Sequence, residues 1–279
     1  MPTGQPLAHQ LTPEWSAPAG VLATFTLRGG GVSAPPFDSF NLGDHVRDDP
    51  AAVAHNRQQL GHTLGAHPVF LQQVHGTGVV TLQAQTPDGA EGDACITTQP
   101  GLACTIMVAD CLPVLFTHRS GTVVAAAHAG WRGLAGDAQG RGVLETTLDA
   151  VIETVCQQQP GLTAAEVVEG VQVWLGPCIG PSAFEVGAEV RQAFVERQPE
   201  ARACFSEALE SAGVAGKWMG DLAGLARQRL QARGVVQIDG NDSSAAWCTV
   251  ENNSRFFSHR RDAVRLGSTG RMAACIWIA

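Results

Sequence analysis

Positive charge and long apolar runs are both scarce in this chain of 279 residues. Charged residues make up only 16% of it, and acidic residues outnumber Lys and Arg, which gives a formal net charge of −8. This balance argues against a nucleic acid or an anionic membrane surface as the main partner. No apolar run approaches the roughly 20 residues of a membrane span. The N-terminal stretch MPTGQPLAHQLTPEW lacks the basic and apolar regions of a signal peptide. We therefore expect a cytoplasmic protein.

Paired cysteine motifs are missing too, although the chain contains eight cysteines. None of them forms a CxxC pair, and their spacing is not that of a tight disulfide framework. In a large cytoplasmic chain most such cysteines are small core residues that stay reduced. The GxxxxGKS/T and GxGxxG patterns are also absent, so a nucleotide P-loop is not supported. We expect core packing for the cysteines in apolar, periodic segments, which are Cys95, Cys104, Cys156 and Cys275.

Apolar residues account for 44% of the chain, enough to fill a large core. Because predicted strands and helices mix without a regular βαβ alternation, we expect a mixed α/β (α+β) fold with central β-sheets flanked by helices. There is no internal repeat or interdomain linker, which predicts a single domain over 1–279 with a loosely ordered lead-in at 1–20. Strands are predicted at 21–27, 69–74, 79–82, 102–108, 113–116, 123–127, 171–175, 235–238 and 273–278. Helices are predicted from 48 to 64, from 143 to 155, and at 189–196 and 221–232.

The most informative pattern is a pair of apolar runs, 113–116 and 123–127, that flank a short polar turn and predict a β-hairpin. Cys111 precedes the first run and His128 follows the second, so antiparallel pairing places both side chains at the same end of a sheet. His75 ends another predicted strand and is followed by a glycine. A thiol and imidazoles at matched strand ends can form either a metal site or a nucleophile–base pair.

A long loop, RGGGVSAPPFDSFNLGDHVRDDP, is the second informative segment. It has no periodicity of its own, and loops of this length are usually functional or disordered. Polar and charged side chains suited to binding or catalysis are supplied by Asn41, Asp44, His45 and Arg47, whereas a solvated connection is the alternative. Arg57, on the helix that follows, is placed to point back towards the loop.

A series of motifs in the chain resembles one known family. The motifs are GGVSxxPFxSxNLGxHVxDDP, QVHG, ADCLPVLF, AHAGWRG, GPCIGPxxFEV and, near the C-terminus, FFSHRRD followed by TGRMA. Together they resemble the YfiH-like, laccase-domain family over nearly the whole chain, from about residue 23. The resemblance implies one compact catalytic domain with β-sheets in its middle layers. It also implies that His75, Cys111 and His128 bind one zinc ion.

These three ligands also suit zinc on chemical grounds. Two imidazoles and one thiolate match a catalytic zinc site, which keeps a fourth position for water or substrate. A zinc ion of this kind lowers the pKa of its bound water to about 7. We expect Asp110 to accept the other N–H of a ligand histidine, with a helix N-cap or turn role as the alternative.

Members of the family have been described as purine nucleoside phosphorylases with adenosine deaminase activity, polyphenol oxidases and peptidoglycan editing factors. The resemblance predicts a zinc-dependent purine nucleoside phosphorylase that deaminates adenosine at the same site. Its partners would be small molecules, a purine nucleoside and phosphate. Arg57 and Arg132 are candidate phosphate or ribose contacts, and Asn41 is a candidate hydrogen-bond partner of purine or ribose. Loop-tethering hydrogen bonds are the equal alternative for all three. We expect a monomer or a weak homodimer.

Other functions remain open. A copper-dependent polyphenol oxidase would use the same His/His/Cys set, with Met107 inviting comparison to a blue-copper axial thioether. One such set cannot supply several coppers, however, and the sequence lacks paired HxH motifs. A peptidoglycan-precursor hydrolase would instead use Cys111 as nucleophile and His128 as base. A non-enzymatic scaffold is disfavoured because an open metal position has little structural purpose.

Overall fold

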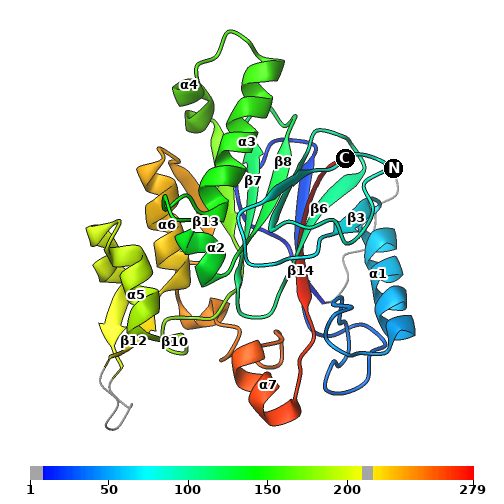
Figure 1. Ribbon diagram of the computed structural model, residues 1–279. Helices are drawn as coiled ribbons and strands as arrows, with labels where there is room; N and C mark the ends of the chain where they lie inside the picture. The colour runs from blue at the N-terminus through cyan, green and yellow to red at the C-terminus, as the bar shows by residue number, and fades with distance from the viewer. Residues whose placement is uncertain (1–8, 209–215) are drawn as a thin grey trace.

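The computed structural model describes residues 9–208 and 216–279, whose strands form two large sheets packed face to face (Figure 1). The five-stranded sheet contains, in spatial order, β1 (Gln10–Leu11), β2 (Val21–Thr26), β14 (Met272–Ile278), β6 (Leu102–Val108) and β3 (His67–Phe70). The six-stranded sheet contains β13 (Gln237–Gly240), β9 (Val171–Leu175), β7 (Leu112–His118), β8 (Val124–Ala129), β5 (Ala94–Thr97) and β4 (Val79–Thr81).

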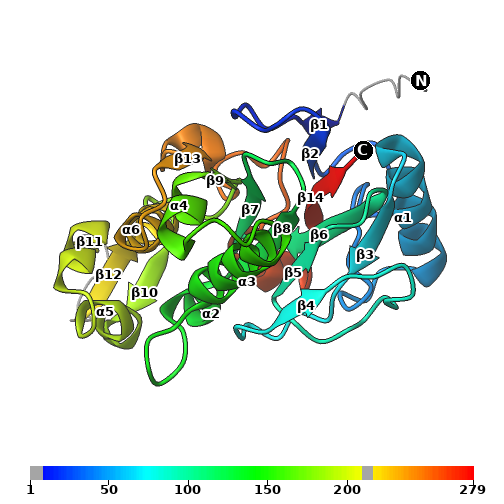
Figure 2. The same ribbon diagram turned by 90° about the horizontal axis from the view of Figure 1, so that it is seen from above.

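The helices are α1 (Pro50–Leu64), α2 (Trp131–Ala135), α3 (Val143–Gln158), α4 (Ala164–Glu169), α5 (Ala188–Val195), α6 (Leu222–Ala232) and α7 (His259–Leu266). Short 3-10 turns are Pro199–Cys204 and Ala245–Trp247, and a third, small sheet consists of β10 (Glu185–Gly187), β12 (Lys217–Gly220) and β11 (Phe205–Glu207). Seen from above, this small sheet lies beside α5 and α6, on the far side of the molecule from α1 (Figure 2). Among the helices of the described ranges, none has the length and apolar character needed to cross a membrane.

Alternating side chains along the strands build three apolar layers. Ile106 of β6 and Leu115 of β7 point into the space between the two large sheets. Their neighbours point the other way, so that Met107 packs in the layer beneath α1 and Phe116 packs in the layer beneath α3. The molecule is therefore a stack of helix, sheet, sheet and helix, which confirms the predicted mixed α/β fold with β-sheets in its middle layers.

The N-terminal segment is packed where the structure describes it. Residues 1–8 of the predicted loosely ordered lead-in lie outside the described residues. In the remainder, Gln10 and Leu11 pair with β2, and Leu11 and Trp15 pack against the apolar layer between the sheets. These contacts attach the described part of the segment to the sheets.

The predicted elements differ from the observed ones mainly at short segments. The strand predicted at 69–74 is His67–Phe70 in the structure, because the chain leaves the sheet after Phe70. The Gln73 side chain then exchanges two hydrogen bonds of 2.8 Å with the backbone of Met107 and replaces strand pairing. Helix α7 was not predicted because its sequence, HRRDAVRL, has few apolar residues, and four of its eight residues are Arg or Asp. Capping by the Ser258 side chain starts it instead.

Candidate metal centre and its cavity

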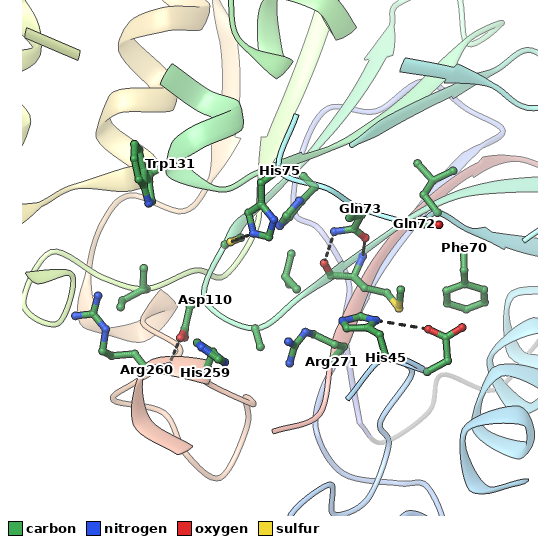
Figure 3. Close-up of a pocket in the computed structure, with 18 of the residues that line it drawn as sticks. His45, Phe70, Gln72, Gln73, His75, Asp110, Trp131, His259, Arg260 and Arg271 are labelled. Atoms are coloured by element: carbon green, nitrogen blue, oxygen red, sulfur yellow. Dashed lines mark hydrogen bonds and ion pairs between the residues drawn. The ribbon is translucent and has the colours of Figure 1, made fainter. Parts of the chain in front are cut away.

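One hairpin end and a turn bring His75, Cys111 and His128 together. His75 was predicted to end a strand, but it lies in a turn five residues beyond the end of β3. The hairpin of β7 and β8 pairs Leu112 with Ala129, so Cys111 and His128 lie at one end of the six-stranded sheet, as predicted. His75 reaches the same place from the segment after β3, with a backbone φ of 62° (Figure 3). The ligand atoms of the three residues lie within 4.8 Å of one another, and Cys111 Sγ is 3.9 Å from His75 Nε2.

Two glycines of the AHAGWRG motif permit this close approach. A Cβ atom on Gly130 would lie 2.9 Å from His75 Cδ2 and 3.0 Å from Cys111 Sγ. A Cβ atom on Gly133 would lie 2.7 Å from the carbonyl oxygen of Gly76. A side chain at either position would displace the segment that carries His75, so both glycines belong to the construction of the site.

Asp93 holds both histidines in place. Its buried carboxylate pairs with His128 Nδ1 at 2.9 Å. It also accepts the backbone N–H groups of Val74, His75 and Gly76 at 3.2, 2.9 and 2.6 Å. A carboxylate on one ring nitrogen fixes the tautomer and orientation of a histidine and leaves the other nitrogen for a ligand. Bonds from three successive N–H groups fix the turn that carries His75.

The predicted role of Asp110 as the acceptor for a ligand histidine is corrected by its contacts. The carboxylate of Asp110 accepts hydrogen bonds from Thr249 Oγ1 and from the backbone N–H of Arg260, both at 2.6 Å. Arg260 lies in the first turn of α7, so Asp110 satisfies a free N–H at a helix start, which was the alternative role. Nothing in the sequence distinguished Asp93, because only the pairing of β5 with β8 places it beside His128.

The three ligands are coupled electrostatically. Burial raises the pKa of the Cys111 thiol, but the charge of His128 and hydrogen bonds from both histidines outweigh burial and lower this pKa to about 6. Burial lowers the pKa of His128, but Cys111 and Asp93 outweigh it and raise this pKa to about 9. A thiolate is the form of cysteine that binds a metal or attacks a carbon atom. The protein therefore prepares Cys111 for either role at neutral pH.

The cluster opens into a cavity of about 720 Å³, a volume typical of small-molecule sites. Trp131 and Phe70 lie on opposite sides of His75 along this cavity (Figure 3). His45 and Arg271 lie together on its lower wall in the same view. The cavity therefore has a metal end, defined by the three ligands and Trp131, and a basic end, defined by His45, Arg57, Phe70 and Arg271.

Arg57 reaches the basic end from α1 and lines the cavity. Its guanidinium lies over the ring of Phe70, with Cζ 4.0 Å from the centroid, and Nε donates to the carbonyl oxygen of Leu42 at 2.9 Å. Asp44 and Asp88 pair with it at 3.3 and 3.7 Å. These carboxylates offset the charge of Arg57.

Asn41 lies behind the basic end and is not among the described residues that line the cavity. Its side chain is fully buried. The Oδ1 atom accepts the backbone N–H groups of Gly43 and Arg271 at 2.9 and 2.8 Å, and Nδ2 donates to the Gly43 carbonyl and to Asp48 at 3.0 and 2.9 Å. These are the contacts of the loop-tethering alternative, and they use both donors and both acceptor positions of the amide. This arrangement leaves Asn41 no polar group for a substrate.

Of the two remaining predicted residues, Met107 is among the described residues that line the cavity and Arg132 is not. Arg132 is exposed on α2 and stacks over Trp131, with Cζ 4.5 Å from the ring centroid. It therefore lies behind a residue that lines the metal end. Met107 lines the cavity, and its Sδ atom lies 3.9 Å from Arg57 Nη2.

Three basic residues of the cavity were not predicted as site residues, although they lie in motifs that carry the family resemblance. His259 and Arg260 belong to FFSHRRD, and Arg271 belongs to TGRMA. Basic residues inside distinctive motifs were the available signal. Their distance along the chain from the metal ligands concealed their place in the same cavity.

Comparison with known proteins identifies the family. The family model described as "Multi-copper polyphenol oxidoreductase laccase" matches residues 22–279. The chain belongs to this laccase-like, YfiH family. A purine nucleoside phosphorylase of Pseudomonas aeruginosa is 49% identical over 268 residues, which cover 96% of this chain and 98% of the relative. Purine nucleoside phosphorylase YfiH of Escherichia coli is 44% identical over 274 residues, which cover 98% of this chain and 100% of the relative. The predicted family is confirmed, and these names support an enzyme.

Solved structures of family members share the fold. A crystal structure of a Neisseria meningitidis protein of family DUF152 has a TM-score of 0.80 and 41% identity, and the match covers 97% of this chain and 99% of that one. YlmD from Geobacillus stearothermophilus also has a TM-score of 0.80, with 29% identity and coverage of 98% and 97%. The layered mixed α/β architecture is therefore that of the family.

The donor set of the cluster fits a single metal ion. In residues 9–208 and 216–279, it is the one group of three or more His, Cys, Asp or Glu side chains close enough to hold an ion. One thiolate and two imidazoles suit zinc and also copper. The contact between Asp93 and His128 supplies the outer hydrogen bond that metal-binding histidines usually have.

Proposed function

We propose that this protein is a zinc-dependent purine nucleoside phosphorylase that also deaminates adenosine at the same site. One observation carries the proposal, namely the cluster of His75, Cys111 and His128 in the wall of a cavity of about 720 Å³. That volume suits a nucleoside together with phosphate. The relatives named purine nucleoside phosphorylase, which align over nearly their whole length, support it.

In this proposal His75, Cys111 and His128 hold the zinc ion, and Asp93 holds their geometry through His128 and the His75 turn. A bound zinc ion supplies a Lewis acid that polarises an oxygen atom or lowers the pKa of water. Arg57, whose charge is offset by carboxylates, offers hydrogen bonds to ribose from the cavity wall. Arg132 reaches only a substrate that extends past Trp131.

Both reactions attack an electron-poor carbon of the nucleoside. In phosphorolysis a phosphate oxygen bonds to C1′ of the ribose while the bond from C1′ to the purine nitrogen breaks, and the base leaves with a proton. In deamination a water oxygen bonds to C6 of adenine and ammonia leaves. Phosphorolysis therefore requires phosphate, whereas deamination does not.

The test incubates the zinc-loaded protein with adenosine, with and without inorganic phosphate, and separates the products by chromatography. We expect adenine and ribose 1-phosphate only when phosphate is present, and slower formation of inosine under both conditions. Metal analysis should find about one zinc per chain, as a three-ligand site implies. If zinc is bound and neither inosine nor a free base forms, the proposal is wrong.

A second candidate function rests on the same residues. Asp93, His128 and Cys111 form the carboxylate–imidazole–thiol chain of a cysteine hydrolase, and the pKa of Cys111 is lowered to about 6. Cleavage of a peptidoglycan precursor through Cys111 would use His128 as the acid–base group. A covalent substrate adduct on Cys111, located by mass spectrometry, would support this function over the zinc enzyme. Resistance of Cys111 to alkylation until zinc is chelated would oppose it.

Copper is the alternative metal, because the family is described as a multi-copper polyphenol oxidoreductase. A copper-dependent polyphenol oxidase would need electron-transfer chemistry from this one cluster. Stoichiometric copper in the active protein, with zinc absent and a phenol oxidised, would favour that function. Stoichiometric zinc without phenol oxidation would exclude it.

We propose that residues 1–279 act as one catalytic domain in the cytoplasm on small molecules, without nucleic acid or membrane. We also propose a monomer or weak homodimer. Light scattering over a range of protein concentrations measures the association, and a stable higher oligomer would contradict this assignment.

A further inference from the structure

Arg271 differs from the other arginines of the cavity because both Nε and Nη2, one whole edge of its guanidinium, are unpaired in the described parts of the chain. Its Nη1 atom donates to the carbonyl oxygens of Thr269 and Gly270 at 3.0 and 3.2 Å. Its Nε and Nη2 atoms have no hydrogen-bond partner among the described residues, yet neither is fully enclosed. Because Arg271 lines the cavity, these N–H groups are available to a ligand there.

In the two other cavity arginines, the edge formed by Nε and Nη2 already has a protein partner. Arg57 is paired with Asp44 and Asp88. Arg260 donates Nη1 and Nη2 to the carbonyl oxygens of Ala183 and Glu185, both at 3.0 Å. Of the three, Arg271 is therefore the one whose Nε and Nη2 atoms both lack a hydrogen-bond partner within the described part of the chain.

The loop around Asn41 holds Arg271 in a fixed position. The backbone N–H of Arg271 donates to Asn41 Oδ1 at 2.8 Å. Gly43 packs so closely that a Cβ on it would lie 2.7 Å from Cγ of Arg271. Together with the two carbonyls bound by Nη1, these contacts orient the guanidinium before any ligand arrives, which reduces the cost of binding.

Arg271 also lies within electrostatic range of the metal end. Burial lowers the pKa of Arg271, whereas Cys111 and Asp110 act in the opposite direction. The Asp110 carboxylate accepts hydrogen bonds from Thr249 and from the first turn of α7, and within the described structure it forms no ion pair with Arg271. A partly buried cation without its own carboxylate is costly unless an anion joins it.

We propose that Arg271 forms an anion subsite that holds inorganic phosphate next to the metal ligands, with Asn41 and Gly43 as positioning residues. The inference rests on the proposed phosphorolysis and names the group that binds its second substrate. Adjacent N–H groups of a guanidinium bind two oxygens of a phosphate at once, and Nε and Nη2 are the pair left free. Arg57, with its charge offset, is left to contact the nucleoside.

The first test varies phosphate at saturating adenosine in Arg271→Gln, Arg271→Lys and the matched control Arg260→Gln. We expect the KM for phosphate to rise about 10- to 100-fold in Arg271→Gln, the usual effect of losing hydrogen bonds to a charged group. The rise should be smaller in Arg271→Lys, which keeps the charge but lacks the fork. The KM for adenosine should change less than that for phosphate. Arg260→Gln should leave the KM for phosphate unchanged. An unchanged KM for phosphate in Arg271→Gln overturns the proposal.

The second test measures binding of inorganic phosphate to the zinc-loaded protein by calorimetry, without nucleoside. We expect the wild type to bind and Arg271→Gln to bind at least about 10-fold more weakly. If the wild type phosphorolyses no purine nucleoside, the proposed function fails, but this difference in binding still supports the subsite. Equal binding, or no binding by the wild type, overturns it.

Gly43→Ala provides a variant that keeps the Arg271 side chain, so it covers the case in which Arg271→Gln does not fold. Its added methyl group should shift the guanidinium and raise the KM for phosphate. Gly161→Ala is the control, because a Cβ there meets no neighbour within 4 Å and the backbone is not left-handed. Thermal unfolding checks that each variant is folded. A KM for phosphate equal to that of wild type in folded Gly43→Ala would argue against the positioning role.

Discussion

The two ends of the cavity are built in different ways. At the metal end, Cys111 and His128 lie at the paired ends of β7 and β8, and His75 lies in a turn beyond β3. One carboxylate, Asp93, contacts both His128 and the turn of His75. At the basic end, Asn41 of the long loop contacts Arg271, which is 230 positions away in the sequence. The metal end is therefore built mainly from local structure, namely one hairpin and one turn. The basic end depends on tertiary packing, which brings the long loop around Asn41 against Arg271 near the C-terminus. The same packing leaves Nε and Nη2 of Arg271 unpaired among the described residues.

The largest expected effect tests the metal end. His75→Ala, Cys111→Ala and His128→Ala should each lower the zinc content from about one per chain to near zero, because two remaining ligands hold zinc poorly. Phosphorolysis and deamination should both disappear with the metal. Elemental analysis, activity assays and circular dichroism check zinc, catalysis and folding. A folded ligand variant that keeps stoichiometric zinc would remove that residue from the site.

The next effect separates Asp93 from Asp110. Asp93→Asn should weaken zinc affinity about 10- to 100-fold, the usual result of losing the partner of a ligand histidine. Asp110→Asn is the matched control and should leave zinc affinity unchanged, because its carboxylate contacts Thr249 and α7. Competition with a chelator measures both affinities. Equal losses in the two variants would contradict the separate roles assigned to them.

A third effect concerns the reactivity of Cys111 in metal-free protein. Because the pKa of Cys111 is lowered to about 6, its thiolate should form as the pH rises through about 6. The alkylation rate should therefore increase from pH 5 to 7 and then level off. In His128→Ala the midpoint should move to higher pH, because the charge that lowers this pKa is lost. Mass spectrometry of the modified Cys111 peptide gives the rates, and a midpoint near that of an ordinary cysteine in the wild type would contradict the coupling.

The smallest effect tests the basic end through Asn41. Asn41→Ala should lower the free energy of unfolding by about 1–3 kcal/mol, because it leaves buried backbone groups without partners. Asn253→Ala on an exposed turn is the control and should change it by less than about 0.5 kcal/mol. Denaturant titration measures both. A large rise in the KM for adenosine without loss of stability would instead indicate that Asn41 touches the nucleoside.

Local pattern accounts for what the sequence predicted correctly. The strands at 102–108 and 171–175 have the predicted bounds. The hairpin that joins Cys111 to His128 followed from two apolar runs and a short turn, because the pairing of neighbouring strands is set over a few residues. The distinctive motifs pointed to His75 as the third candidate ligand and to the family. All of these signals lie within short segments of the chain.

Only the tertiary structure decided the partners of the polar side chains. Asp110 bonds to Thr249, which is 139 positions away, and Asp93 takes the role predicted for Asp110. Asn41 is a buried support of its loop, and Arg271 is the cavity arginine whose Nε and Nη2 are both unpaired within the described ranges. The physical reason is that a hydrogen bond requires two groups to meet within about 3 Å. For segments far apart in sequence, only the packing of the two sheets and their loops determines which groups meet.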